Sequence, residues 1–184
     1  MTKNEEDVRT RLQRAALALF QERGYEQTTA AEIAARVGVT ERTFFRHFPD
    51  KREVLFQGEA ILRAALTASI ASAPAEIGPL DTLFRAFHAI QQVIEANRPF
   101  AKPRHDVISN TPALQERELA KTEALARSLA DALQARGVSE LHAALAARAG
   151  MAAFAYATIS WLEDPEIGLA ERLDRAYDGL KSLF

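Results

Sequence analysis

GVTERTFFRHFPDK, residues 38–51, gathers three Phe, two Arg, one His and one Lys into fourteen residues. Most of the remaining chain is rich in Ala and Leu at helical spacing. Thr40 is a residue type that caps helices, and the helix after it must end before Pro49 because a proline disfavours helical backbone in the residue that precedes it. The segment is therefore predicted to be a two-turn helix that either packs as a small buried cluster or presents a basic surface.

Helical spacing divides the aromatic residues of this segment between two faces. Phe44 and Phe48 share one face and are predicted to be buried, because Phe is usually buried in folded proteins. Arg42, Phe45 and Arg46 share the opposite face. An exposed ring between two Arg predicts contact with a negatively charged partner, and an ordinary solvated face is the alternative.

Composition indicates a folded globular protein. Of the 184 residues, 48% are hydrophobic and 26% are charged, which is close to average usage. There is no Cys, so disulfides and thiolate sites are excluded, and a reducing compartment, the cytoplasm, is expected. The N-terminus has no apolar stretch typical of a secretory signal, and the longest uncharged run, 149–162, is too short to span a bilayer. No membrane partner is expected.

The positive charge is concentrated in one part of the chain. The formal net charge of −2 argues by itself against a nucleic-acid partner. Residues 36–52, however, carry a net charge of +3, whereas residues 57–184 carry −3. The segment that holds the unusual aromatic residues is therefore also the basic segment.

Helical periodicity predicts an all-α chain of about nine helices in two domains, 1–50 and 51–184. The first domain holds three helices, from Val8 to Gly24, from Thr29 to Gly38, and from Thr40 to before Pro49. Asp50 with Glu53 is typical of a capping box and predicts one longer helix that runs to about Ser72. Further helices are predicted over 80–97, 100–109, 112–136, 139–163 and from about 166 to the end. Their boundaries are marked by Pro99, Pro103, Pro112, Gly137 and Pro165.

The order of the first three helices, with Gly38 at the turn, is helix-turn-helix geometry. In that geometry the last helix enters the major groove, where Arg42 and Arg46 can bond guanine and Phe45 can contact a thymine methyl. Nearby hydroxyl and basic groups are predicted to contact phosphates: Thr29, Thr43, His47 and Lys51. The sequence therefore predicts a DNA-binding domain.

Residues 14–56 resemble the DNA-binding region of the TetR family of bacterial transcription regulators. The ordered features are an Ala-rich first helix that ends in LF, then GY, TT, IAARVGV, FRHFPDK and VLF. The resemblance implies that Arg42 and its neighbours read bases while the four predicted phosphate-contacting residues position the domain. The family usually has Tyr at position 45, and many members have Gly at position 42, where this chain has a long hydrogen-bond donor.

In the remaining chain, 57–184, the resemblance implies an effector pocket and a dimer interface. LHAALAARAGMAAFAYATISWL, residues 141–162, has many small residues that allow another helix to approach closely. With the last helix it is the predicted homodimer interface, and an ordinary Ala-rich core helix is the alternative. The two-fold symmetry of such a dimer predicts a palindromic operator.

Aromatic residues with a few polar neighbours are the predicted lining of the effector pocket: Phe84, Phe87, His88, Phe100, Arg104, His105, Phe154 and Trp161. The run RHDVISNTPALQERELAK, residues 104–121, resembles family members thought to sense acyl-CoA-like ligands, and Arg104 is the expected anion partner there. A drug-like or aromatic effector is equally open.

Motifs for catalysis or metal binding are not found in the sequence. The four His have no spacing typical of a zinc site, and there is neither a GxSxG motif nor a phosphate-binding glycine loop. We therefore expect no catalytic residue, no metal and no cofactor. The leading prediction is an effector-responsive DNA-binding repressor, and the alternative is a helical ligand-binding or protein-interaction module without sequence-specific DNA binding.

Overall fold

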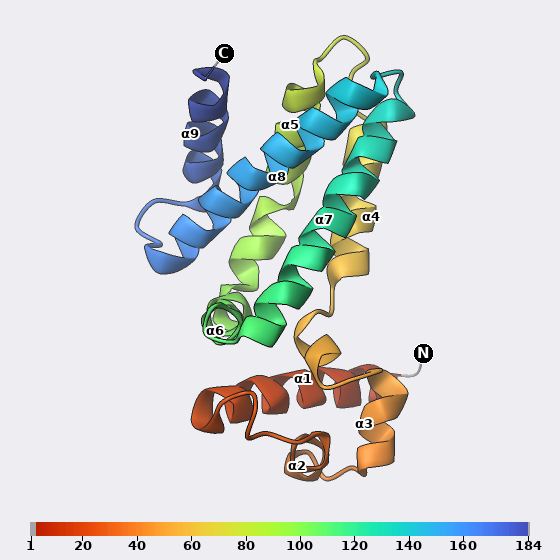
Figure 1. Ribbon diagram of the computed structural model, residues 1–184, viewed down its shortest axis with the longest axis vertical. Helices are drawn as coiled ribbons and strands as arrows, with labels where there is room; N and C mark the ends of the chain where they lie inside the picture. The colour runs from red at the N-terminus through yellow and green to blue at the C-terminus, as the bar shows by residue number, and fades with distance from the viewer. Residues whose placement is uncertain (1–2, 184) are drawn as a thin grey trace. The chain divides into compact units, whose positions relative to one another are not determined.

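The computed structural model describes residues 3–183, with side chains from Val8 onward. These residues form nine α-helices and one 3-10 helix and no strand, so the all-α prediction is confirmed (Figure 1). They pack as two compact units. The N-terminal unit combines the chain up to Gln57 with Pro99–Glu118, and the C-terminal unit combines Gly58–Arg98 with the chain from Leu119 onward. The packing units therefore differ from the contiguous domains 1–50 and 51–184 expected from the sequence.

The N-terminal unit begins with the three expected helices, α1 (Lys3–Arg23), α2 (Ala30–Arg36) and α3 (Glu41–His47). Helix α2 starts at a complete capping box between Thr29 and Glu32, and the Thr40 hydroxyl accepts from the Thr43 N–H at 3.2 Å at the start of α3. Between them Gly38 has φ +74°, a left-handed conformation that glycine adopts without steric cost.

The core of this unit contains the two rings that were predicted to be buried. Phe44 and Phe48 are both 0% exposed, with ring centroids 5.3 Å apart, and belong to a cluster formed with buried residues of α1 and α2. Side chains of the second segment, among them Val107 and Leu114, belong to the same cluster. The burial prediction is confirmed, and the cluster extends to helices that the sequence assigned to the other domain.

The prediction of a single long helix from residue 50 to about Ser72 is wrong. The chain forms a short 3-10 helix, η1 (Arg52–Leu55), and then α4 (Glu59–Ala71). The Asp50 carboxylate accepts from the Glu53 N–H at 3.0 Å, but the Glu53 carboxylate binds Arg117 and does not complete the box. Gly58 lies between the two helices with φ +91°, a left-handed conformation that ends helical continuity.

The second segment of the N-terminal unit holds α6 (Arg98–Ser109) and the start of α7 (Pro112–Gln134). The boundary predicted at Pro103 is wrong, because this proline lies inside α6. It cannot donate a backbone hydrogen bond to the preceding turn, yet Val107 and Ile108 on the same helix are buried in the core cluster. Packing therefore outweighs the local cost of proline here.

The C-terminal unit is a helical bundle made of α4, α5 (Pro79–Ala96), most of α7, α8 (Glu140–Glu163) and α9 (Leu169–Lys181). Helix α8 packs on α5 and α9, and α4 packs on α5. A Cβ added to Gly150 of α8 would lie 3.0 Å from Cδ1 of Leu83, so α5 and α8 approach closely at this glycine. None of the described helices has the length and apolarity needed to cross a membrane.

Candidate nucleic-acid interface

The outward face of α3 presents two arginines on either side of an aromatic ring. Arg42 and Arg46 are exposed, and Phe45 is 49% exposed with its ring edge-on to buried Phe44 at 5.4 Å. Neither arginine forms a hydrogen bond or ion pair with another residue that the structure describes. Their guanidinium groups are therefore available to an external acceptor.

Other arginines of the basic segment are neutralised by acidic neighbours. Arg36 binds Glu22 through two hydrogen bonds of 3.0 and 2.7 Å, and this contact raises the pKa of Arg36 while lowering that of Glu22. Arg52 binds Asp50 at 3.2 Å. Two of the positive charges that the sequence places in residues 36–52 are thus paired with carboxylates. The charges of Arg42 and Arg46 on α3 are not paired in this way within the described residues.

Two predicted phosphate-contacting hydroxyls already have partners at helix starts. Thr29 accepts from the Glu32 N–H at 3.2 Å, and its own N–H and hydroxyl lie 2.8 and 2.9 Å from the Glu32 carboxylate. The Thr43 hydroxyl lies 3.0 Å from that of Thr40. These contacts fix the positions of the first turns of α2 and α3.

The remaining two candidates are more enclosed. His47 is half-buried, with its ring 6.4 Å from that of Phe48. The Lys51 ammonium donates to the backbone carbonyls of Tyr25 at 2.7 Å and Thr28 at 2.8 Å, and burial lowers its pKa. Because an ammonium has three donors, one remains for another acceptor. The sequence did not predict this role of Lys51, since backbone acceptors have no sequence signature.

Five of the eight predicted effector-binding residues lie in the C-terminal unit. Four are buried aromatic residues of α5 and α8: Phe84, Phe87, Phe154 and Trp161. The rings of Phe87 and Phe154 are 4.6 Å apart, so these rings fill the space between α5 and α8. The fifth, His88, is half-buried with Nε2 3.0 Å from Asp174 of α9.

The other three lie in the N-terminal unit. Phe100 packs against its core cluster, and His105 Nε2 lies 3.3 Å from the Ser109 hydroxyl. Arg104, the predicted anion partner, donates from Nε to the Leu55 carbonyl at 2.6 Å and binds Glu118 at 2.7 Å. Its charge is therefore already paired within the unit, and the eight residues do not gather in a single unit.

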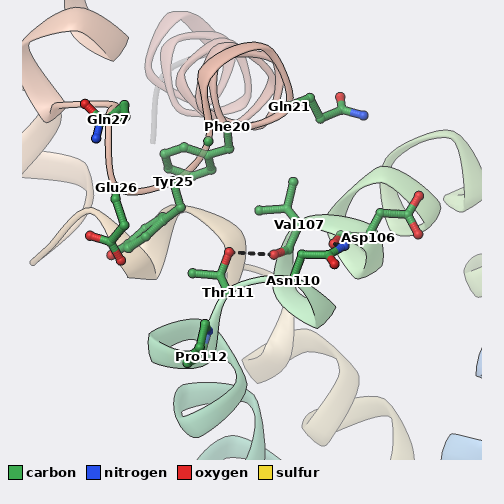
Figure 2. Close-up of a pocket in the computed structure, with 11 residues that line it drawn as sticks. Phe20, Gln21, Tyr25, Glu26, Gln27, Asp106, Val107, Asn110, Thr111 and Pro112 are labelled. Carbon is green, nitrogen blue, oxygen red and sulfur yellow. Dashed lines mark hydrogen bonds between the residues drawn. The ribbon is translucent and has the colours of Figure 1, made fainter.

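A surface hollow of about 500 Å³ opens in the N-terminal unit beside the loop that follows α1. Figure 2 shows Phe20 and Tyr25 facing the end of α6, where the Thr111 hydroxyl donates to the Val107 carbonyl at 2.8 Å. None of the eight predicted effector-binding residues lines it. Two acidic residues, Glu26 and Asp106, line it, and Asp106 is bound by Lys102 at 2.5 Å.

Helices α8 and α9 together present an apolar outer face. Tyr156 and Leu145 of α8 are 71% and 58% exposed. A hollow of about 510 Å³ lies between the two helices, lined by small residues such as Ala152 of α8 and Gly179 of α9. Of the small residues that the sequence predicted for close helix approach, Ala153 lines this hollow, whereas Gly150 faces Leu83 of α5.

Both the N-terminal and the C-terminal part of the chain match known protein families. Residues 12–57 match the model for bacterial regulatory proteins of the tetR family, and residues 77–184 match the model for the MftR C-terminal domain. The regulator TcmR of Streptomyces glaucescens is 34% identical over 137 residues, which cover 70% of this chain and 60% of TcmR. The chain therefore spans less than two thirds of that relative.

Solved structures with the same fold include two whose ligands are known. FadR of Thermus thermophilus, a repressor in complex with lauroyl-CoA, has a TM-score of 0.60 and 26% identity, covering 94% of this chain and 93% of FadR. SmeT of Stenotrophomonas maltophilia, in complex with triclosan, has a TM-score of 0.69 and 21% identity, covering 96% of this chain and 91% of SmeT. At that identity the second likeness concerns the fold alone.

Proposed function

Because this chain belongs to the TetR family of bacterial regulatory proteins, we propose that it is a repressor that binds a palindromic operator as a homodimer and is released by a small hydrophobic ligand. The observation that carries the proposal is the exposed face of α3, where two arginines that have no acidic partner among residues 8–183 flank Phe45. A short helix that displays unpaired donors while its other face is buried is suited to reading base edges in the major groove.

In this proposal the residues of α3 divide the recognition between them. Arg42 and Arg46 form bidentate hydrogen bonds to guanine, each worth about 1–3 kcal/mol of discrimination against a wrong base. Phe45 contacts a thymine methyl. Phosphate contacts come from the starts of α2 and α3 and from the end of the motif: Thr29, Thr43, His47 and Lys51.

Dimerisation through α8 and α9 would supply the symmetry of the operator. Exposed apolar side chains such as Tyr156 and Leu145 next to small residues allow two copies to pack helix against helix. A two-fold interface brings two α3 helices to successive turns of the same groove, which sets the half-site spacing.

Release by effector requires that the ligand prefer the conformation that does not bind DNA. The buried aromatic residues of α5 and α8 favour a ligand with an apolar body. Acyl-CoA-like and drug-like ligands both fit that description, and the relatives FadR and SmeT are found with lauroyl-CoA and triclosan, respectively.

The test is a titration of labelled DNA from the region upstream of the gene, at two salt concentrations and with nonspecific competitor. The wild type is expected to bind with affinity that falls steeply as salt rises, because binding displaces counterions from the phosphates. The double variant Arg42→Ala, Arg46→Ala is expected to lose at least tenfold in affinity for the operator.

Arg127→Ala is the matched control, since Arg127 is an exposed residue of α7 in the other unit. It is expected to bind as the wild type does. Equal operator affinity of the wild type and the α3 double variant would reject α3 as the reading helix. Binding that competitor DNA abolishes would reject sequence-specific recognition and favour the helical interaction module.

A further inference from the structure

Arg98 is a cation that has no acidic partner in the part of the chain whose side chains are described. It is the first residue of α6 and the last residue of the first stretch of the C-terminal unit, Gly58–Arg98. Its Nη2 donates to the Leu162 carbonyl at 2.9 Å, and its guanidinium carbon lies 5.7 Å from the centroid of the Trp161 ring. Its Nε is buried and has no acceptor among residues 8–183. A desolvated guanidinium donor of this kind is costly unless something pairs with it.

Thr158 of α8 has the second unsatisfied polar atom of this region. Its hydroxyl oxygen is buried and has no hydrogen-bond partner in the described chain. Other helical hydroxyls in this protein bond the carbonyl four residues earlier, as Thr67 does to Arg63 and Thr82 to Gly78. Thr158 does not use this ordinary local acceptor, so its hydroxyl is available to a group outside the helix.

The two unsatisfied atoms lie close to the same end of α8. Thr158 precedes Leu162, whose carbonyl holds Arg98, by four residues, which is about 6 Å along a helix axis and on the same face. Phe154 lies one turn further back on that face, and its ring contacts Phe87 of α5. A row of aromatic rings therefore leads to two unpaired hydrogen-bond donors.

We propose that Arg98 and Thr158 bind the carboxylate head of an amphiphilic effector whose apolar body lies along Phe87, Phe154 and Trp161. The proposal rests on the proposed function and names the ligand class. A carboxylate is acceptor-only when ionised, so it can accept from both donors and neutralise the guanidinium. A neutral head of the same shape would leave the charge of Arg98 unpaired.

The position of Arg98 also connects ligand binding to the DNA-binding unit through the chain itself. Beyond this residue the rest of α6 packs with the N-terminal unit. Because the ring centroids of Phe87 and Phe154 are only 4.6 Å apart, the apolar body must separate these rings on entry. Binding therefore changes the packing around α8 and anchors the first residue of α6 to a new partner.

Trp161 is the only Trp in the sequence, so intrinsic fluorescence reports directly on this site. Dodecanoate and dodecanol, used below their aggregation limits, have the same chain and differ in the charge of the head. Dodecanoate is expected to change the fluorescence saturably and to bind at least tenfold more tightly than dodecanol. Equal affinity of the two, or no saturable change with dodecanoate, would overturn the proposal.

Variants test whether Arg98 and Thr158 cause the preference for dodecanoate over dodecanol. Thr158→Val keeps the shape of the side chain, and Arg98→Gln removes the charge; each is expected to weaken dodecanoate binding about tenfold while leaving dodecanol binding within twofold. Thr67→Val and Arg127→Gln are matched controls, with a satisfied hydroxyl and an exposed arginine. An unchanged ratio of the two affinities in both test variants would refute the assignment.

The fluorescence assay contains no DNA, so its outcome is independent of operator binding. Release of labelled operator by dodecanoate, lost in Arg98→Gln, would support the coupling through α6. Saturable dodecanoate binding without release of operator would overturn that coupling, while the proposed carboxylate site would still stand. Absence of operator binding in the ligand-free protein would reject the proposed function while the fluorescence result still decides the site.

Discussion

The ammonium of Lys51 lies 3.9 Å from the centroid of the Tyr25 ring while it donates to the carbonyls of Tyr25 and Thr28. Burial lowers the pKa of Lys51 and raises that of Tyr25. We expect Lys51→Met to remove the Lys51 donor from the Thr28 carbonyl, while the Tyr25 carbonyl keeps the Thr28 N–H at 3.3 Å. The free energy of unfolding should fall by about 1–3 kcal/mol. Denaturation in urea measures this loss.

Lys102→Met provides the comparison for Lys51, because Lys102 forms a surface pair with Asp106 four residues later. That pair is worth about 0.3–0.5 kcal/mol. Equal losses in the two variants would show that the Lys51 contacts contribute no more than a surface ion pair.

Truncation of two adjacent rings on α3 is expected to affect different properties, stability for Phe44 and operator affinity for Phe45. Phe44→Ala removes a fully buried ring and should cost about 3–5 kcal/mol of stability. Phe45→Ala removes a half-exposed ring and should cost about 1 kcal/mol or less, while operator affinity falls. Urea denaturation and DNA titration on the same samples separate the two effects. A large stability loss in Phe45→Ala would assign that ring to the core instead.

Acid should weaken the capping box of α2. Hydrogen bonds from the N–H and hydroxyl of Thr29 lower the pKa of Glu32 below its ordinary value of 4.5. A carboxylate with a lowered pKa stabilises the fold fully above the unfolded value, and this contribution disappears as pH falls through the folded value. Between pH 6 and about pH 3 the wild type should therefore lose more stability than Glu32→Gln does.

Glu76→Gln makes the same change in charge at an exposed loop residue. It should lose stability with acid in parallel with the wild type. If Glu32→Gln also follows the wild type, the capping carboxylate does not contribute to the acid sensitivity.

The outer face of α8 should control assembly. Tyr156→Arg places a charge in the proposed dimer interface and is expected to convert the dimer to a monomer at micromolar concentration, as measured by light scattering. Val93→Arg, at a residue of α5 that is 72% exposed, is the matched control and should keep the mass of the wild type. A dimeric Tyr156→Arg variant would place the interface elsewhere.

Sequence reasoning predicted the helix starts and the two faces of α3 because both depend on short-range rules. Thr29 and Thr40 cap helices through neighbours three residues away, and helical spacing alone separates Phe44 from Phe45. These features did not require knowledge of the fold.

Errors arose where distant residues decide the outcome. Glu53 forms half of a capping pattern in the sequence, but Arg117, 64 residues away, takes its carboxylate. Pro103 marks a boundary in the sequence, but burial of α6 keeps the helix intact. The ion pair between Arg104, a predicted ligand contact, and Glu118 likewise has no signature in the sequence. The same holds for Arg98, whose lack of an acidic partner among residues 8–183 is visible only in the structure.

The N-terminal unit is assembled from two separate stretches of chain, and this has a practical meaning for exchanging modules between regulators. A transplant cut at Gln57 would carry the reading helix but leave behind Val107, Ile108 and Leu114, which complete its core cluster. The buried Glu53 would also lose Arg117. A chimera that inherits residues 99–118 along with the N-terminal helices keeps that core and its ion pair together, so the natural unit of exchange is discontinuous in sequence.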